Sequence, residues 1–153
     1  MPIIIHPSDD DAEALCRAIT IDLPEYFGLP ECNEQYATGV RNKINFGVQL
    51  NNTFIGLLSL DFCYPKNANI YWMGILRKHQ NKGYGRLLIE KAIEYAKKSH
   101  AKTMTVETLA PSEADENYLN TYRFYERAGF HPLFNLKPEQ YAWNMVYMCH
   151  VID

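Results

Sequence analysis

Hydrophobic and polar positions at the start of the chain predict one short strand followed by a helix. Ile3–His6 is a β run, and Pro7–Asp11 has the composition of a helix start, with Ser8 or Asp9 as the cap and acidic residues in the first turn. Apolar residues then follow at helical spacing: Ala12, Leu15, Cys16 and Ile19. The first helix therefore has one face that is expected to pack on a core.

A second helix and a β-hairpin are expected next. Helix-breaking residues interrupt the chain at Pro24, Gly28 and Pro30. Asn33 is suited to cap a helix that runs to about Lys43. Apolar residues then alternate with polar ones through Phe46–Leu50, Asn51–Asn52 provides a tight turn, and Thr53–Phe62 returns as a long strand.

The second half of the chain continues the alternation of strands and helices. The expected elements are a strand at Asn69–Leu76, an amphipathic helix at Gly83–His100, a strand at Thr103–Thr108, a helix at Tyr118–Ala128 stopped by Gly129, and a closing pair of strands at Phe130–Asn135 and Asn144–Val151. This order predicts a mixed α/β fold (α+β), with helices on both faces of a sheet. A chain of 153 residues is expected to form a single domain over residues 1–153.

Composition and charge narrow the possible functions. An apolar share of 47% excludes a disordered chain, and the net charge of −3 argues against a dedicated nucleic-acid binder. No apolar run approaches the ~18 residues that span a bilayer, and the N-terminus lacks the basic start and long apolar stretch of a signal peptide. The protein is therefore expected in the cytoplasm, with no membrane partner. Four scattered cysteines are expected to be structural thiols, without a metal: Cys16, Cys32, Cys63 and Cys149.

The segment from Leu76 to Leu88 carries the strongest chemical signal. A strand ends, a basic loop follows, and Gly83 and Gly85 stand where a long helix begins. Backbone N–H groups at a helix start suit a phosphate, and residues 77–102 hold eight Lys or Arg against two acids. The alternative is a glycine-softened helix start with a solvated basic face. A P-loop motif is absent, and Leu88 stands where a dinucleotide-binding fingerprint needs its third glycine.

Two motifs carry a resemblance to a known family. Gln80–Gly85 fits the pattern Q/R-x-x-G-x-G/A, and Phe124–Phe130, one helix and one strand later, fits F/L-Y-x-x-x-G-F. With this separation and in these elements, the chain resembles the GNAT superfamily of N-acetyltransferases, in particular its small bacterial, acetyl-CoA-dependent members. The resemblance covers the whole chain. A tryptophan near the last strand, Trp143, is a further feature that resembles small bacterial members.

The resemblance implies a fold and a binding mode for acetyl-CoA. The fold is a twisted, mostly antiparallel sheet of about seven strands, with splayed fourth and fifth strands and about four flanking helices. The pantetheine arm would lie in the splay and pair with the backbone of Gly74, Ile75 and Leu76. The pyrophosphate would bind the N–H groups of Gln80, Asn81, Lys82, Gly83, Tyr84, Gly85 and Arg86. Asn117 is a further candidate contact to the arm, or else the cap of its helix.

The resemblance also implies catalytic roles. The N–H of Ile75 would stabilise the oxyanion, and the hydroxyl of Tyr125 would protonate the departing thiolate, unless Tyr125 is only a core residue. Many relatives place a Glu base in the fourth strand, where this chain has Asn69. Glu107 in the fifth strand is the substitute candidate, with a surface-facing strand acid as the alternative; a water relay would serve equally. Asp61 and Glu31 are weaker candidates.

The expected partners are acetyl-CoA and an amine. Residues 1–35 carry eight acids against Arg17, which would attract a cationic amine, unless these acids only start helices and solubilise a face. A monomer or a homodimer is expected, with Tyr141–Val151 as a possible edge strand. Two other functions stay open: a catalytically degenerate acyl-CoA-binding module, which Asn69 favours, and a toxin that acetylates aminoacyl-tRNA, which the negative charge disfavours.

Overall fold

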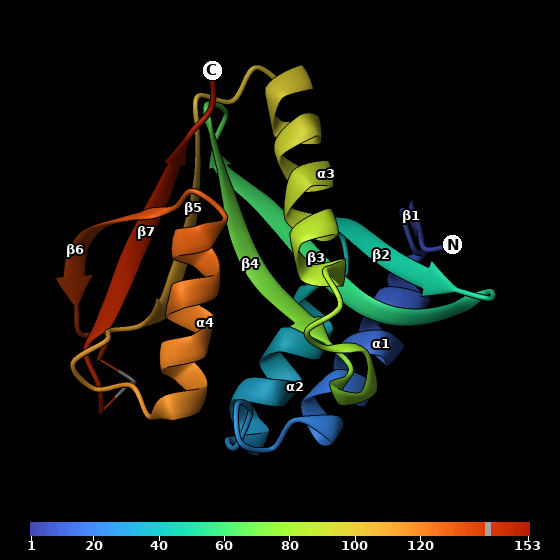
Figure 1. The fold of residues 1–153 in the computed structure, drawn as a ribbon, viewed down its shortest axis with the longest axis horizontal. Helices are drawn as coiled ribbons and strands as arrows, with labels where there is room; N and C mark the ends of the chain where they lie inside the picture. The colour runs from blue at the N-terminus through green and yellow to red at the C-terminus, as the bar shows by residue number, and fades with distance from the viewer. Residues whose placement is uncertain (140–141) are drawn as a thin grey trace. The chain divides into compact units, whose positions relative to one another are not determined.

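A computed structural model describes residues 1–139 and 142–153 of the chain (Figure 1). Its elements follow the expected order. They are β1 (Ile3–Ile5), α1 (Asp9–Asp22), α2 (Pro30–Gly39), β2 (Ile44–Leu50), β3 (Thr53–Tyr64), β4 (Asn67–Ile75), a short 3-10 helix η1 (Arg77–His79), α3 (Tyr84–Lys98), β5 (Thr103–Leu109), α4 (Glu116–Arg127), β6 (His131–Leu136) and β7 (Met145–Val151).

The fold is mixed α/β, as predicted. Its strands form one sheet in the order β1-β2-β3-β4-β5-β7-β6. The pairs β1–β2, β2–β3, β5–β7 and β6–β7 are antiparallel. This order confirms the predicted sheet of seven strands. It also places β7 between two strands, so that β6, and not the segment Tyr141–Val151, provides the sheet edge. Tyr141 itself lies outside the described residues.

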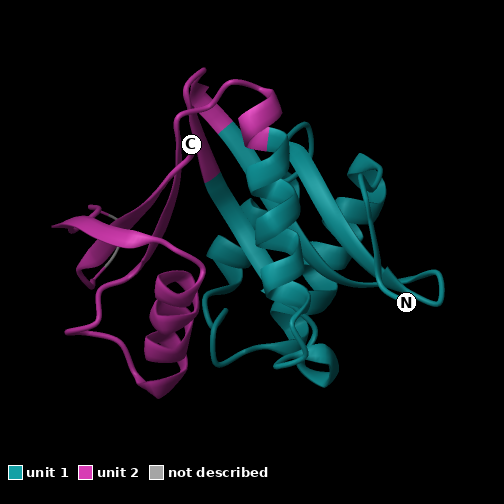
Figure 2. Cartoon of the chain, turned by 45° about the horizontal axis from the view of Figure 1, so that its top comes forward, with its two compact units in different colours: residues 1–61, 70–95 teal, residues 62–69, 96–153 magenta. Residues whose placement is uncertain are grey.

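Two compact units divide the chain (Figure 2). Unit 1 comprises residues 1–61 and 70–95, and unit 2 comprises residues 62–69 and 96–153. The single domain expected over residues 1–153 stays a prediction, as does the splay of β4 from β5. None of the described helices is long and apolar enough to cross a membrane.

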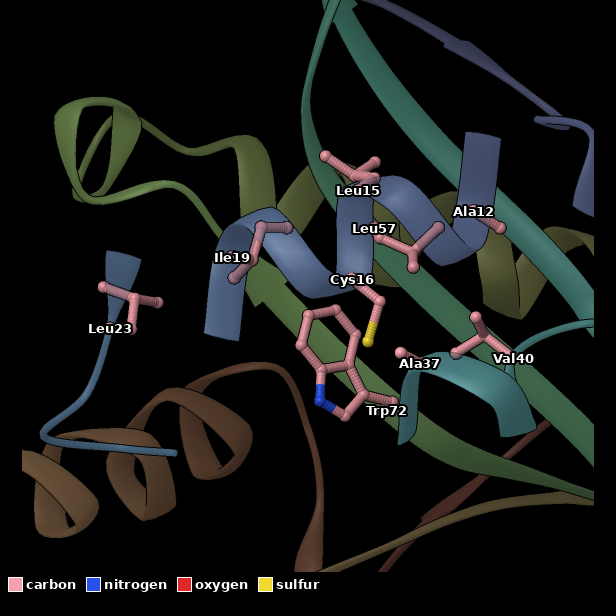
Figure 3. Close-up of a cluster of buried hydrophobic side chains, with 9 residues drawn as sticks. All are labelled: Ala12, Leu15, Cys16, Ile19, Leu23, Ala37, Val40, Leu57 and Trp72. Carbon is pink, nitrogen blue, oxygen red and sulfur yellow. The ribbon is translucent and has the colours of Figure 1, made fainter. Parts of the chain in front are cut away.

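The core of unit 1 lies between α1, α2 and one face of its strands (Figure 3). Figure 3 shows the indole of Trp72, from β4, beside the side chain of Cys16 in α1. Leu57 of β3 faces the same cluster. Phe46 of β2 contacts Tyr95 of α3 instead, so α3 covers the opposite face of these strands. The predicted helical spacing of apolar residues in α1 is confirmed.

The boundaries of α2 differ from the prediction. The helix begins at Pro30, and Asn33, which was expected to cap it, donates its side-chain amide to the carbonyl of Phe27 at 2.8 Å. Proline suits the first helical position, since its missing N–H has no partner there in any case. The helix ends at Gly39, four residues before the expected end at Lys43. A Cβ at Gly39 would collide with the hydroxyl of Tyr71, so tertiary packing requires glycine there.

Unit 2 contains β5, β6, β7 and α4, which packs against β5. Met104, Val106 and Met148 are buried on one face of the strands, and Phe130 is fully buried directly after α4. All four cysteines of the chain are free thiols, as expected. Burial raises the pKa of the Cys16 thiol to about 12, which makes this residue inert in the core of unit 1.

We expect Gly74→Ala to destabilise the protein by about 1–3 kcal/mol through overpacking. A Cβ at Gly74 would lie 2.7 Å from the Trp72 ring and 2.8 Å from Ile19. Gly28→Ala is the matched control, because its Cβ would meet only the Pro24 carbonyl, at 3.4 Å. Denaturant unfolding of both variants checks this, and a similar small loss in both would contradict it.

Candidate functional site

Polar contacts within unit 1 hold the segment between β4 and α3. Arg77 donates its backbone N–H to a carboxylate oxygen of Asp22 at 2.7 Å. Its guanidinium donates to the Asp22 carbonyl at 2.9 Å and to Glu25 at 2.6 Å, and this contact lowers the pKa of the Glu25 carboxyl. The side-chain amide of Gln80 donates to the carbonyl of Ile75 at 3.1 Å. The turn is therefore fixed before α3 begins.

A row of backbone N–H groups opens α3. In the described part of the chain, no acceptor is recorded for the N–H groups from Asn81 to Arg86; the first recorded bond joins the N–H of Leu87 to the Gly83 carbonyl at 3.1 Å. Positive φ values of 60° at Asn81 and 88° at Gly83 turn the backbone. Free N–H groups at the positive end of a helix dipole form a site for an anion. The predicted phosphate donors from Asn81 to Arg86 are thus free, whereas the N–H of Gln80, which was also expected to bind the pyrophosphate, donates to the carbonyl of Arg77 at 3.2 Å.

The side chains around the row add positive charge. Lys78, Lys82 and Arg86 are exposed. Arg86 lies 3.6 Å from Glu90, whereas no ion pair is recorded for Lys78 or Lys82 within residues 1–139 and 142–153. Two lysines next to the free N–H groups therefore increase the attraction for a phosphate.

The backbone at the end of β4 is partly engaged. Leu76 donates its N–H to the carbonyl of Ile55 in β3 at 2.9 Å, and its carbonyl accepts from His79 at 2.9 Å. Leu76 therefore has no free N–H for a ligand, although it was expected to pair with one. Alternate residues of a hairpin strand direct their N–H groups to the same neighbour, so the N–H of Ile75 points away from β3. A Cβ at Gly74 would collide with the side chains of Trp72 and Ile19, so packing within unit 1 accounts for this glycine.

Ion pairs neutralise much of the acidic N-terminal region. Arg17 lies 2.9 Å from Glu13 and 2.5 Å from Glu34, which joins α1 to α2. Arg41 lies 2.9 Å from Asp10 and 3.1 Å from Glu13. The arginine contacts lower the pKa of the Glu13 and Glu34 carboxyls. These acids lie at a helix start or bridge the helices α1 and α2. The structure therefore favours the interpretation that they serve the fold over the interpretation that they attract a cationic amine.

Tyr125 is the buried member of the second motif, in unit 2. Its side chain is 7% exposed, and its ring contacts those of Phe124 and Phe130 at centroid distances of 5.4 and 5.6 Å. Burial raises the pKa of the Tyr125 hydroxyl well above its usual value, so the hydroxyl keeps its proton at neutral pH. Gly129 ends the motif with a φ of 96°, and His150 occupies the space where its Cβ would lie.

Asn69 and Glu107 lie on neighbouring strands of unit 2 and have different roles. Asn69 accepts a hydrogen bond from the hydroxyl of Thr105 at 2.9 Å. Two residues earlier on each strand, Thr103 donates to Asn67 at 2.8 Å, and Asn67 donates to Thr105 at 3.1 Å. This side-chain ladder, which includes Asn69, joins the start of β4 to β5.

Glu107 is half-buried, and its oxygen Oε1 is buried without a partner among the described residues. Desolvation raises the pKa of its carboxyl, against a lowering hydrogen bond from Tyr147. It is thus not the surface-facing acid of the alternative interpretation. A half-buried carboxyl group whose pKa is raised is a candidate proton acceptor.

The three remaining candidate residues, Asn117, Asp61 and Glu31, lie in different surroundings. Asp115, not Asn117, caps α4, since its carboxylate accepts from the N–H of Tyr118 at 3.0 Å. Asn117 is a half-buried residue of the first turn. Asp61 lies 3.9 Å from Lys43, and Glu31 is exposed in the first turn of α2.

Sequence patterns did not reveal three contacts of this site. The pairing of Arg77 with Asp22 joins residues 55 positions apart. The sequence gives only a weak indication of the ladder of Thr103 and Thr105, namely polar residues at alternate positions of one strand. Tyr147 gave no signal of its own, since its role depends on the register of β5 with β7.

No cluster of three or more His, Cys, Asp or Glu that could hold a metal occurs in the part of the chain described.

We expect Gly129→Ala to lower the free energy of unfolding by about 2–4 kcal/mol through backbone strain and overpacking. Its φ is 96°, and the new Cβ would lie 2.8 Å from Nδ1 of His150. Gly83→Ala, with a φ of 88° but open space around the Cβ, is expected to cost about 1 kcal/mol. Denaturant unfolding compares the two, and equal losses would show that the His150 contact contributes nothing.

Solved structures share this fold. A GNAT-family protein from Desulfovibrio desulfuricans superposes with a TM-score of 0.83 at 17% identity, over 100% of both chains. The ribosomal-protein-S18-alanine N-acetyltransferase from Escherichia coli gives a TM-score of 0.76 at 20% identity, over 99% of this chain and 94% of that one. An aminoglycoside 6'-N-acetyltransferase complexed with coenzyme A gives 0.75 at 14% identity, over 99% and 97%.

The sequence supports the same assignment independently of the fold. The profile of the acetyltransferase (GNAT) family matches residues 13–130, which include the turn before α3 and the motif that ends at Phe130. This match covers most of the chain. The chain therefore belongs to the GNAT family of acetyltransferases.

Proposed function

We propose that the protein is an N-acetyltransferase that moves the acetyl group of acetyl-CoA to a primary amine of a small molecule or peptide, by direct attack in a ternary complex. The observation that carries the proposal is the row of free N–H groups from Asn81 to Arg86 in a chain of the GNAT family. We further propose that it works in the cytoplasm as a monomer or homodimer, without a metal.

The turn before α3 is the proposed site for the pyrophosphate. Its N–H groups are free and its ends are fixed, so binding an anion requires little rearrangement of the backbone. Lys78 and Lys82 are available for additional charge contacts. A structural relative is complexed with coenzyme A, which supports this ligand for the family fold.

The edge of β4 is the proposed site for the pantetheine arm and the thioester. The backbone of Ile75, whose N–H points away from β3, would pair with the arm, whereas Leu76 is already bonded to β3. The N–H of Ile75 would donate to the carbonyl oxygen as it becomes an oxyanion, a contribution of roughly 3 kcal/mol for a positioned donor. The amine nitrogen forms a bond to the carbonyl carbon, and the bond from that carbon to sulfur then breaks.

Two side chains of unit 2 are proposed for the proton transfers. The carboxylate of Glu107 would take the proton that the amine loses, and the hydroxyl of Tyr125 would give a proton to the departing thiolate. Because the pKa of Glu107 is raised by burial, activity should increase with pH as this carboxyl ionises. Asn69, which bonds Thr105 and cannot accept a proton from an amine, has no catalytic role here.

We expect coenzyme A to protect the protein against heat, because it binds the folded state alone. At about 100 times its dissociation constant the melting temperature should rise by roughly 5–10 °C. Gly83→Glu should abolish most of this shift, since it places a negative charge against the free N–H groups; Gly83→Ala, the control for the backbone strain, should keep it. Differential scanning fluorimetry is the measurement. Equal protection of Gly83→Glu and the parent would refute the pyrophosphate site.

We expect Tyr125→Phe and Glu107→Gln each to lower kcat/KM by roughly 100-fold, the usual size of a general acid–base contribution. Tyr122→Phe, one helical turn from Tyr125 in α4, is the matched control and should keep full activity. Release of coenzyme A is followed spectrophotometrically with a panel of primary amines and peptides. Thermal protection by coenzyme A should persist in all three variants.

Other results of this assay would favour other functions. Tight binding of coenzyme A without turnover of any amine, and with no effect of Tyr125→Phe, would favour a catalytically degenerate acyl-CoA-binding module. Acetylation confined to aminoacyl-tRNA, with strong salt dependence, would favour the toxin.

A further inference from the structure

The carboxylate of Glu107 has an unequal environment at its two oxygens. On β5, Met104, Val106 and Thr108 are buried, while Thr105 and Glu107 lie on the alternate, half-buried face. Oε1 is buried and has no partner within the described residues, whereas the carboxylate accepts a hydrogen bond from Tyr147. Oε1 is therefore shielded from solvent, and the hydrogen bond from Tyr147 orients the carboxylate.

Tyr147 is placed for this contact by the register of the sheet. It lies directly opposite Glu107 in the antiparallel pair of β5 and β7, where side chains on the same face are neighbours. Phe134, its partner in β6, holds the Tyr147 ring at a centroid distance of 5.6 Å and an interplanar angle of 35°. The hydroxyl of Tyr147 is thus presented to the carboxylate by two adjacent strands.

The other titratable groups around Glu107 are few. Cys149 follows Tyr147 on the same face of β7, and His131 lies across from Cys149 in β6. Where β5 adjoins β4, the ladder residues Thr105 of β5 and Asn69 of β4 carry no charge. Helix α4, which packs against β5, carries exposed charges at Glu116, Arg123, Glu126 and Arg127. Among the described residues, Tyr147 provides the recorded interaction that favours the ionised carboxylate.

We propose that Tyr147 is the positioning residue for the Glu107 base: its hydroxyl bonds the carboxylate and fixes its orientation for the proton that the acceptor amine loses. This inference rests on the proposed function, since it takes Glu107 as the proton acceptor. The hydrogen bond stabilises the ionised carboxylate against its desolvation, so the base is available at lower pH than burial alone would allow. The carboxylate takes the proton of the amine when the amine nitrogen has bonded to the acetyl carbon.

The test compares Tyr147→Phe with the parent protein in two measurements. The first is the pH profile of kcat/KM for the amine. The second is the titration of the Glu107 carboxyl by NMR with ¹³C-labelled glutamate, in which Glu107→Gln identifies the signal. Removal of the hydroxyl should shift both midpoints to higher pH by about one pH unit, since a hydrogen bond to a charged group is lost. The KM for acetyl-CoA should not change.

Two further variants separate positioning from general loss of structure. Tyr64→Phe removes a hydroxyl from a 75% exposed tyrosine of unit 2 and should shift neither midpoint. Phe134→Leu keeps the Tyr147 hydroxyl but removes the ring that holds it, and should shift both midpoints in the same direction by less. Because Phe134 is 56% exposed, this variant is expected to fold even if Tyr147→Phe does not.

The outcomes distinguish this inference from the proposed function. If Glu107→Gln loses activity while Tyr147→Phe and Phe134→Leu leave both midpoints unchanged, the role of Tyr147 is refuted and the proposed function stands. If Glu107→Gln acetylates amines at the parental rate, Glu107 is not the base, and this inference fails with that part of the proposed function. A shift of the midpoints in both variants, with loss of activity in Glu107→Gln, supports both.

Discussion

The proposed chemistry of this protein depends on backbone N–H groups that have no partner in the folded chain. The first N–H groups of a helix always lack intrahelical partners, and their value for a ligand depends on how firmly the preceding turn is held. Here the contacts are those of Arg77 with Asp22 and Glu25, and of Gln80 with the carbonyl of Ile75. They fix the turn from outside the row and leave the donors from Asn81 to Arg86 without a partner among the described residues.

The proposed mechanism uses different kinds of groups for different tasks. Backbone donors at the end of β4 and the start of α3 would bind acetyl-CoA. The side chains of Tyr125 and Glu107, whose pKa values are raised by burial, would move protons. Backbone donors suit the parts of acetyl-CoA that do not change their protonation, whereas side chains are needed where protons move.

The amide at position 69 belongs to a side-chain ladder between two strands. Thr105 donates to the Asn69 oxygen, and Thr103 donates to Asn67. The ladder joins β4 to β5 with uncharged groups. In the proposed mechanism the base is therefore Glu107, which the register of β5 and β7 places opposite Tyr147.

The sequence by itself determined the order of strands and helices, the start of α1 at Ser8 or Asp9, the glycine turn before α3 and the motif around Tyr125, because these depend on spacing and on residues close in the chain. Tertiary structure decided the rest. It selects Ser8 as the cap of α1 and brings Tyr71 against Gly39 at the end of α2. Asp22 fixes the turn before α3, and Tyr147 sets the environment of Glu107. These contacts join residues far apart in sequence, and burial and register, which set their energies, arise only when the chain has folded.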